Sequence, residues 1–407
     1  MRDILEELPH ALLSDPTRES EDPGVPRELH DDDLVRPAAE EDLPVDAHRS
    51  KRSPLARHVE VVIDPFDPRQ PTQLGLTLAV EGQRVRSGEF TIGFVHQGVE
   101  RRAVGLGVDD VELASLLAPV APGLITQLAM ARAVERLASF TPDALTSLWR
   151  ALAIDLVGVA EHSRALLLTM RRSPRLMPAL AQTTSAADVA LEGIDGGHRL
   201  GHPFGLRTAV PDDEMSTLRR RLDDIERALR GVDDARMLAA LAHLKGAGVL
   251  DIEHAREIGI DGPALLAAGG VPTLAVDLGH DLANLHQGGA HVGCTVARVE
   301  VHLQLLRAAV QRLPRHLARI ATHDGANHEI CSRPTSLSGT HDAFIYGPGG
   351  TTACIIDVQA GLVNRLRIRP PELPLLLGVS RALRGVRLDD VSEVVASFGL
   401  HASALDR

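Results

Sequence analysis

The chain has 407 residues and a formal net charge of -12, with 44% apolar residues but only 2% aromatic residues. This charge excludes a general nucleic-acid surface, which needs clustered Lys and Arg, and the composition points to a core of Leu, Val, Ala and Ile. Three cysteines, Cys294, Cys331 and Cys354, lie far apart. Their spacing fits neither a disulfide framework nor a zinc or iron–sulfur signature, and a reducing, cytoplasmic setting is expected.

Residues 1–57 are expected to form a disordered acidic tail. They hold 15 acidic and 8 basic side chains, a balance of -7, and prolines recur among them. Such a segment cannot bury enough apolar surface to offset its ordering entropy. A docking tail for a partner is the alternative, and nothing in the composition separates the two. The folded domain is expected over residues 58–407.

The start of this domain is expected to be a small antiparallel sheet. Alternating residues predict strands from His58 to Ile63 and from Leu74 to Val80, and Glu81–Gln83 predicts a turn into the next strand. The loop between the first two strands, Asp64–Gln73, contains no histidine.

A glycine- and histidine-bearing motif follows, and then a long uncharged block. Gly93, His96, Gly98 and Glu100 read as G-x-x-H-x-G-x-E at the start of an expected helix. The block from Leu113 to Ala131 carries no charged residue and continues into Ala133-Val134-Glu135. Its length suggests a transmembrane helix, but its internal prolines and glycine favour a helix buried within protein.

This pairing of motif and block resembles the large subunit of [NiFe]-hydrogenases and the D subunit of the proton-pumping NADH:quinone oxidoreductase, complex I. That family has G-x-x-H-R-G-x-E-K before a segment ending in A-V-E, and its hydrogenase members carry the first C-x-x-C of the nickel site there. Counting back from Ala133-Val134-Glu135 places those two cysteine positions on Pro119 and Pro122. Proline offers no metal ligand, so the resemblance brings no nickel site with it.

The resemblance makes Glu100 and His96 a candidate proton relay. The matching glutamate of hydrogenases passes protons to and from the metal site, and a spacing of four places both side chains on one helical face. The alternative is a pair at the helix start that only anchors the sheet onto the bundle. In complex I, a histidine of the first hairpin loop contacts quinone, and this chain lacks it.

Helices are expected to dominate the middle of the chain. A mostly apolar helix is predicted from Leu145 to Met170, and a helix opening at Pro211 carries one apolar stripe of Leu218, Leu222, Ile225 and Leu229. His198 and His202 lie in a glycine-rich loop, where a helical metal pair is disfavoured. The glycines of residues 245–276 match a family insert, and no P-loop pattern accompanies them.

The last third supplies the remaining candidate site residues. Arg298, in a helix predicted from Val296 to Leu313, matches a family arginine and is a candidate for cavity lining. Strands are predicted at Ile345–Gly347 and Cys354–Asp357, followed by a family-like run from Asn364 to Pro371. Matching Asp406-Arg407 to the family ending places the second pair of cysteine positions on His401 and Ala404. His401 is a second candidate for cavity lining.

The expected fold is mainly α with small antiparallel β-sheets (α+β), a helical bundle like the hydrogenase large subunit. The resemblance implies a subunit of a membrane-associated NADH:quinone oxidoreductase-like or hydrogenase-like complex, on the cytoplasmic face of the cell membrane. It would bind no metal cofactor itself. Quinone is a possible ligand, and the partners would be an iron–sulfur small subunit, like the B subunit of complex I, and membrane subunits. The alternative is a noncatalytic scaffold that keeps the fold only to bind that small subunit.

Overall fold

The structure is a computed structural model that describes residues 57–63, 74–93, 96–120, 122–196, 198–207, 210, 212–272, 293–323 and 336–405. Contacts divide the chain into Met1–Ser53 and Pro54–Arg407, and all described residues belong to the second unit. Several sequence expectations fall outside the described residues: the tail before Arg57, the loop Asp64–Gln73, Cys331 and the ending Asp406-Arg407.

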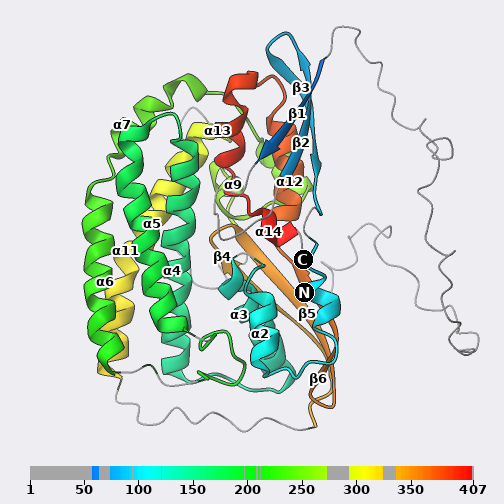
Figure 1. Cartoon of the computed structure of the whole chain (residues 1–407), viewed down its shortest axis with the longest axis vertical. Coiled ribbons are helices and arrows are strands. Elements are labelled where there is room, and N and C mark those ends of the chain that lie inside the picture. The colour runs from blue at the N-terminus through cyan, green and yellow to red at the C-terminus, as the bar shows by residue number, and fades with distance from the viewer. Residues whose placement is uncertain are drawn as a thin grey trace, which may run out of the picture. The chain divides into compact units, whose positions relative to one another are not determined.

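A three-stranded antiparallel sheet begins the unit, as the alternating pattern predicts. Its strands are β1 (Arg57–Ile63), β2 (Leu74–Glu81) and β3 (Arg84–Thr91), in the order β1-β2-β3. Period-two alternation points Leu76, Leu78 and Val80 inward, and all three are buried in one apolar cluster with α12 (Glu372–Ala382). The first sheet is therefore packed against the C-terminal part of the chain (Figure 1).

The uncharged block forms two helices instead of one. After the short α1 (Val99–Arg102) come α2 (Val111–Leu117) and α3 (Gly123–Leu137). Pro119 and Pro122 lie in the break, because proline cannot donate to a helix and clashes with the preceding turn. At Gly123 a Cβ would collide with the Ala118 carbonyl oxygen, so the turn between the helices needs glycine. Within the described part of the chain, no helix has the length and apolar character to cross a membrane.

Four long helices pack side by side as a bundle: α4 (Ala144–Thr169), α5 (Met177–Asp195), α6 (Asp212–Arg230) and α11 (Thr295–Thr322) (Figure 1). The predicted stripe of α6 is buried at all four leucine and isoleucine positions. Asp143 caps α4 by accepting a hydrogen bond from the backbone N–H of Thr146. The predicted helices of the middle region are thus confirmed, and α11 runs nine residues beyond the predicted end at Leu313.

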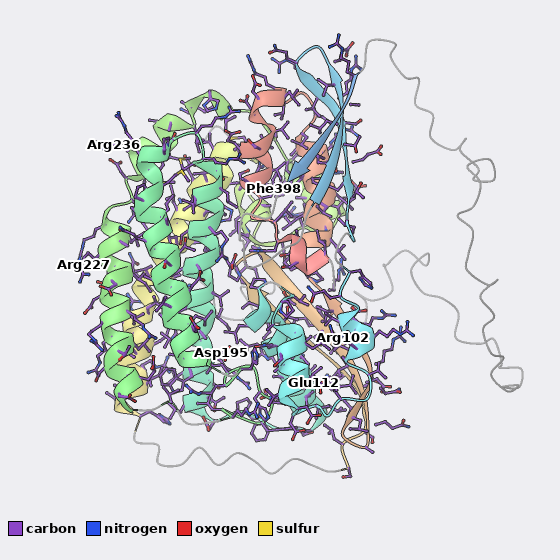
Figure 2. All side chains as sticks on the ribbon, viewed as in Figure 1. Arg102, Glu112, Asp195, Arg227, Arg236 and Phe398 are labelled. Carbon is purple, nitrogen blue, oxygen red and sulfur yellow. The ribbon has the colours of Figure 1, made fainter. Side chains whose placement is uncertain are left out.

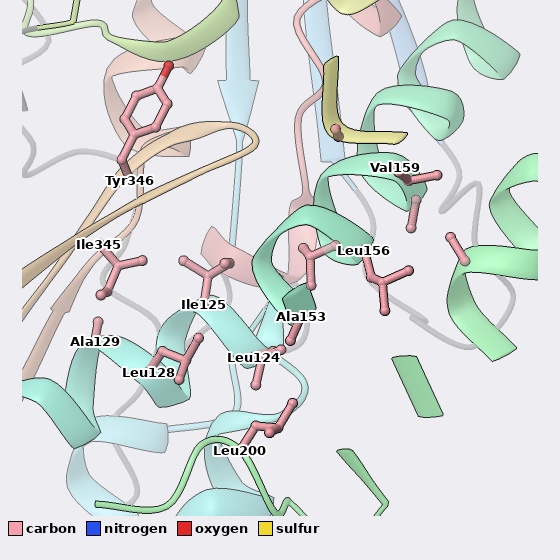
Figure 3. Close-up of a cluster of buried hydrophobic side chains, with 14 of the residues drawn as sticks. Leu124, Ile125, Leu128, Ala129, Ala153, Leu156, Val159, Leu200, Ile345 and Tyr346 are labelled. Carbon is pink, nitrogen blue, oxygen red and sulfur yellow. The ribbon is translucent and has the colours of Figure 1, made fainter. Parts of the chain in front are cut away.

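A second antiparallel sheet lies near the C-terminus, with strands β4 (Gly339–Gly347), β5 (Gly350–Gln359) and β6 (Leu362–Arg369) in that order. Helix α3 lies between this sheet and the bundle. Figure 3 shows its side chains among those of β4 and α4, in a cluster that includes Ile125, Leu128, Ala129, Ala153, Leu156 and Ile345. The two predicted strands are confirmed, and a third, β6, continues the sheet.

Short helices complete the unit. They are η3 (Pro174–Leu176), α7 (Asp234–Ala240), η4 (Ala242–Leu244), α8 (Ile252–Glu257), α9 (Gly262–Ala267), η5 (Leu388–Asp390), α13 (Val391–Ala396) and α14 (Ala402–Leu405). The predicted class, a helical bundle with small antiparallel sheets, is confirmed.

Candidate functional site

Glu100 and His96 do not share a helical face. Gly98 adopts a left-handed conformation (φ 61°) as the N-cap, and α1 begins only at Val99. His96 therefore lies before the helix, where it is exposed. The expectation of a common face was wrong, because a left-handed glycine stops the helix from extending back to His96.

The Glu100 carboxylate connects α1 to strand β6. One oxygen accepts a hydrogen bond from the backbone N–H of Ile368 at 2.9 Å, and the other is 2.5 Å from a guanidinium nitrogen of Arg367. The Glu100 side chain is 16% exposed, whereas that of Arg367 is 57% exposed. This geometry agrees with the alternative role of Glu100 as an anchor. The element to which it anchors α1 is the C-terminal sheet and not the bundle.

A cavity of about 260 Å³ opens beside α1 and α2. Polar groups and apolar side chains share its wall: Gln97, Arg102, Leu106, Glu112, Ser115, Leu116 and Pro119. Figure 2 labels Arg102 and Glu112, which extend from this region. All of its lining residues come from residues 97–119, so the cavity is bounded by the motif segment alone and not by the C-terminus as well.

The second pair of former cysteine positions lies in a packed environment. Ala404 is fully buried in α14, and the Nε2 atom of His401 is 2.7 Å from a carboxylate oxygen of Glu161 on α4. Burial alone would raise the pKa of Glu161, but the charges and hydrogen bonds of His401 and Arg164 outweigh it and lower that pKa to about 2. For His401, burial acts to lower the pKa, and the Glu161 and Glu372 carboxylates outweigh it, so the pKa is raised. Both shifts favour a charged pair.

These positions do not fit a [NiFe] centre. Nickel and iron in such a site need soft thiolate ligands, whereas Pro119, Pro122 and Ala404 have no donor atom and His401 is already paired with Glu161. Among the residues that the structure describes, no three His, Cys, Asp or Glu side chains gather to hold a metal ion.

The two histidines of the glycine-rich loop also form hydrogen bonds with other groups of the chain. The Nδ1 atom of His198 is 2.9 Å from the side-chain amide of Gln127, and Nε2 of His202 is 3.1 Å from the carbonyl oxygen of Asp109. The loop follows the end of α5 at Asp195, so the two histidines do not lie one turn apart on a helix.

Arg298 is fully buried, and it is not among the lining residues of the cavity beside α1 and α2. Its guanidinium donates to the carbonyl oxygens of Gly248 and Gly293 at 2.9 and 2.8 Å and to the Ser397 hydroxyl at 2.9 Å, and it stacks 3.8 Å from the Phe398 ring centre. Gly248 has φ 66°, and a Cβ there would meet Arg298 at 3.1 Å. Burial lowers the pKa of Arg298 to about 9. The residue joins the start of α11 to the segment after α13.

Sequence reasoning missed a buried histidine pair between α4 and α11. The Nδ1 atoms of His162 and His302 are 3.1 Å apart, and Nε2 of His302 is 3.2 Å from the Ser397 carbonyl oxygen. A carbonyl only accepts, so His302 donates from Nε2, its Nδ1 accepts, and His162 donates from Nδ1. Burial lowers the pKa of His302 to about 4, and burial with the nearby His302 lowers the pKa of His162, so both rings are neutral at pH 7. The sequence signal that could have indicated this pair is a histidine on an otherwise apolar face of each of the two helices.

A smaller cavity of about 60 Å³ lies between α4, α11 and the turn from β4 to β5. His162, Tyr346 and an Asp155–Arg312 ion pair contribute its polar wall. Its volume suits a few water molecules and is too small for a ring-sized ligand.

No family model matches the chain. The D subunit of NADH-quinone oxidoreductase from Nocardia farcinica is 28% identical over 230 residues, which cover 53% of this chain and 50% of that protein. The chain thus spans about half the length of this curated relative. The D subunit of the same enzyme from Dehalococcoides mccartyi is 23% identical over 376 residues, 87% of this chain and 100% of that protein.

The chain is similar in sequence to D subunits of NADH-quinone oxidoreductase. The predicted resemblance to the superfamily of complex I and the hydrogenase large subunit is confirmed by these relatives and by a solved structure. That structure is the membrane-bound sulfane sulfur reductase, an archaeal respiratory membrane complex. One of its chains superposes with a TM-score of 0.72 at 18% identity, covering 86% of this chain and 98% of its own. At this identity the match establishes the shared fold.

Proposed function

We propose that this chain is part of a membrane-associated respiratory complex of the NADH:quinone oxidoreductase type. It would take part in electron transfer to quinone and in coupled proton movement without a [NiFe] centre of its own. The observation that carries the proposal is the fold match, which extends over 86% of the chain. Relatives that are D subunits of NADH-quinone oxidoreductase support the same role.

The redox centre would belong to a partner. The four former cysteine positions offer this chain no thiolate, so electrons would arrive from an iron–sulfur small subunit resembling the B subunit of complex I. Membrane subunits would hold the assembly at the cytoplasmic face of the cell membrane. Such partners agree with a chain whose described helices include none that could cross a membrane.

The cavity beside α1 and α2 is the place we assign to the quinone head group. Its volume of about 260 Å³ admits a substituted ring, and it combines hydrogen-bonding side chains with an apolar wall. Gln97 and Arg102 could donate to a quinone carbonyl, while Leu106 and Leu116 would contact the ring. The isoprenoid tail would remain outside.

Purification from membranes tests this role. The full chain, tagged at Met1, should be recovered in mild detergent together with a partner protein that gives an iron–sulfur EPR signal and with quinone reductase activity. Recovery without any such cluster and without quinone reduction would contradict the proposal.

The noncatalytic scaffold is the second candidate, and the tie between Glu100 and β6 favours it. Ser115→Phe separates the two, because a phenyl ring would fill the cavity. If quinone binds there, the KM for a short-chain quinone should rise severalfold while the complex still assembles. The control is Ser216→Phe, at an exposed position of α6. An assembled complex with an unchanged KM in both variants would contradict quinone binding in this cavity and favour the scaffold role.

A further inference from the structure

The last helix, α14, owes its position to contacts with the rest of the chain, and Ser403, Ala404 and Leu405 are buried in them. It has four residues, too few for a helix that is stable alone. Its apolar attachment is a cluster of Leu405 with Leu376, against which Phe90, Leu373, Leu400 and Ala402 pack partly buried. One polar attachment is the ion pair between His401 and Glu161, whose side chains are each 13% exposed.

The charged groups that face His401 come from two elements. From α4 come Glu161, at 2.7 Å, and Arg164, which is 2.5 Å from the other Glu161 oxygen. From α12 comes Glu372, a fully buried carboxylate whose charge also acts on His401. Arg164 is further held by Asp188 of α5 at 3.3 Å. His401 therefore lies near two carboxylates, and one guanidinium is already shared between Glu161 and Asp188.

This arrangement makes the charge of the imidazole matter. With a proton on both nitrogens, His401 compensates the buried charge of Glu161 and Glu372. Without that proton, Glu161 and Glu372 lose the positive charge of the ring in a site that excludes most water, while Glu161 keeps the guanidinium that it shares with Asp188. The loss of a compensating charge in a buried site is costly. The raised pKa of His401 has the same origin.

We propose that Glu161 and His401 form a proton-operated tie between the C-terminal segment and α4. The imidazolium holds residues 400–405 against α4, and its proton passes to water when the tie opens, with no change in oxidation state. Because the pKa of His401 is raised, the tie is closed at low pH and loosens as pH rises through that pKa. The proposal needs only this chain and goes beyond the respiratory role, so either can fail while the other stands.

The test follows the proton and the segment separately in the full chain. NMR titration of the histidine Cε1–H signals, assigned by comparison with His401→Gln, reports the protonation of His401. Hydrogen exchange at the Ala404 amide, which donates to the His401 carbonyl oxygen at 3.2 Å, reports the segment. Protection factors corrected for intrinsic exchange remove the ordinary pH dependence of the rate. His254→Gln is the matched control, because His254 pairs with Glu257 at 3.3 Å on an exposed helix.

Three results are expected. His401 should titrate above the usual pH of a histidine, about 6.5, the protection of Ala404 should fall severalfold through the same pH range, and His401→Gln should abolish that pH dependence while His254→Gln keeps it. Glu161→Gln, with circular dichroism to verify folding, should move the His401 midpoint to lower pH. The proposal is overturned if the protection of Ala404 follows the same pH profile in His401→Gln as in the unmodified chain, or if the His401 midpoint is indifferent to Glu161→Gln.

Discussion

Glu100 lies where α1 meets β6, and its two oxygens contact the Ile368 backbone and the Arg367 side chain. A carboxylate in this position can hold two elements together and can also exchange a proton. The two roles have different dependence on the ionisable group. Loss of the Arg367 side chain removes the ion pair but leaves the Glu100 carboxylate. Loss of the Glu100 charge removes the ion pair and the group that could exchange a proton.

Glu100→Gln should slow quinone reduction by about tenfold or more if a proton passes through this residue. Arg367→Gln is the matched control, because it removes the same ion pair and keeps the carboxylate. Turnover of the purified complex would be compared in both variants at equal assembly. Equal rates in Glu100→Gln and the unmodified complex would assign Glu100 to anchoring alone.

The guanidinium of Arg298 satisfies two backbone carbonyls and a hydroxyl in a fully buried site. Lysine lacks the planar fork of donors, so Arg298→Lys should leave at least one buried acceptor without a partner. The free energy of unfolding in urea should fall by about 2–4 kcal/mol. Arg227→Lys, in an exposed pair on α6, should change it by less than about 0.5 kcal/mol. Equal stability of Arg298→Lys and the unmodified chain would contradict this role.

At the scale of elements, the buried contact between α4 and α11 includes two neutral histidines, His162 and His302. The unfolded chain binds a proton at His302 near pH 6.5 and the folded chain only near pH 4. Between these values the unfolded state binds more protons, so acidification reduces stability.

His302→Gln should reduce this acid sensitivity. The amide can donate to the Ser397 carbonyl and accept from His162, but it cannot take up a proton. Between pH 7 and 5 the unmodified chain should lose about 2 kcal/mol more unfolding free energy than the variant. Urea titrations at both pH values measure it. Parallel losses would show that His302 is not the group responsible.

Helix α3 is buried between β4 and α4 on the face that carries Leu124. Leu124→Asp should prevent folding, because it places an unpaired charge in the core. Leu377→Asp makes the same substitution on α12, where the side chain is 58% exposed, and should cost less than about 0.5 kcal/mol. Circular dichroism and thermal melting compare the two. A cooperative melt of Leu124→Asp at the unmodified temperature would contradict the burial of α3.

For the molecule as a whole, the four former cysteine positions predict a protein without nickel. Elemental analysis of the full chain, purified without a histidine tag from cells grown with added nickel, should find neither stoichiometric nickel nor stoichiometric iron. Proline and alanine offer no donor, and His401 is in an ion pair. One nickel per chain would show that other residues of the chain supply the ligands.

The sequence by itself determined most of the elements and the resemblance to the superfamily of complex I and the hydrogenase large subunit. Period-two alternation in the first sheet, the period-3.6 stripe of α6 and the order of the motifs are local properties, and the chemical identity of Pro119, Pro122 and Ala404 needs no fold to rule out thiolate ligands. Only the tertiary structure decided what each polar side chain meets. Glu100 pairs with a residue 267 positions away, His162 with one 140 positions away, and Glu161 with His401. Hydrophobic periodicity records which face of a helix is buried, but the partner of a buried polar group depends on how distant elements pack.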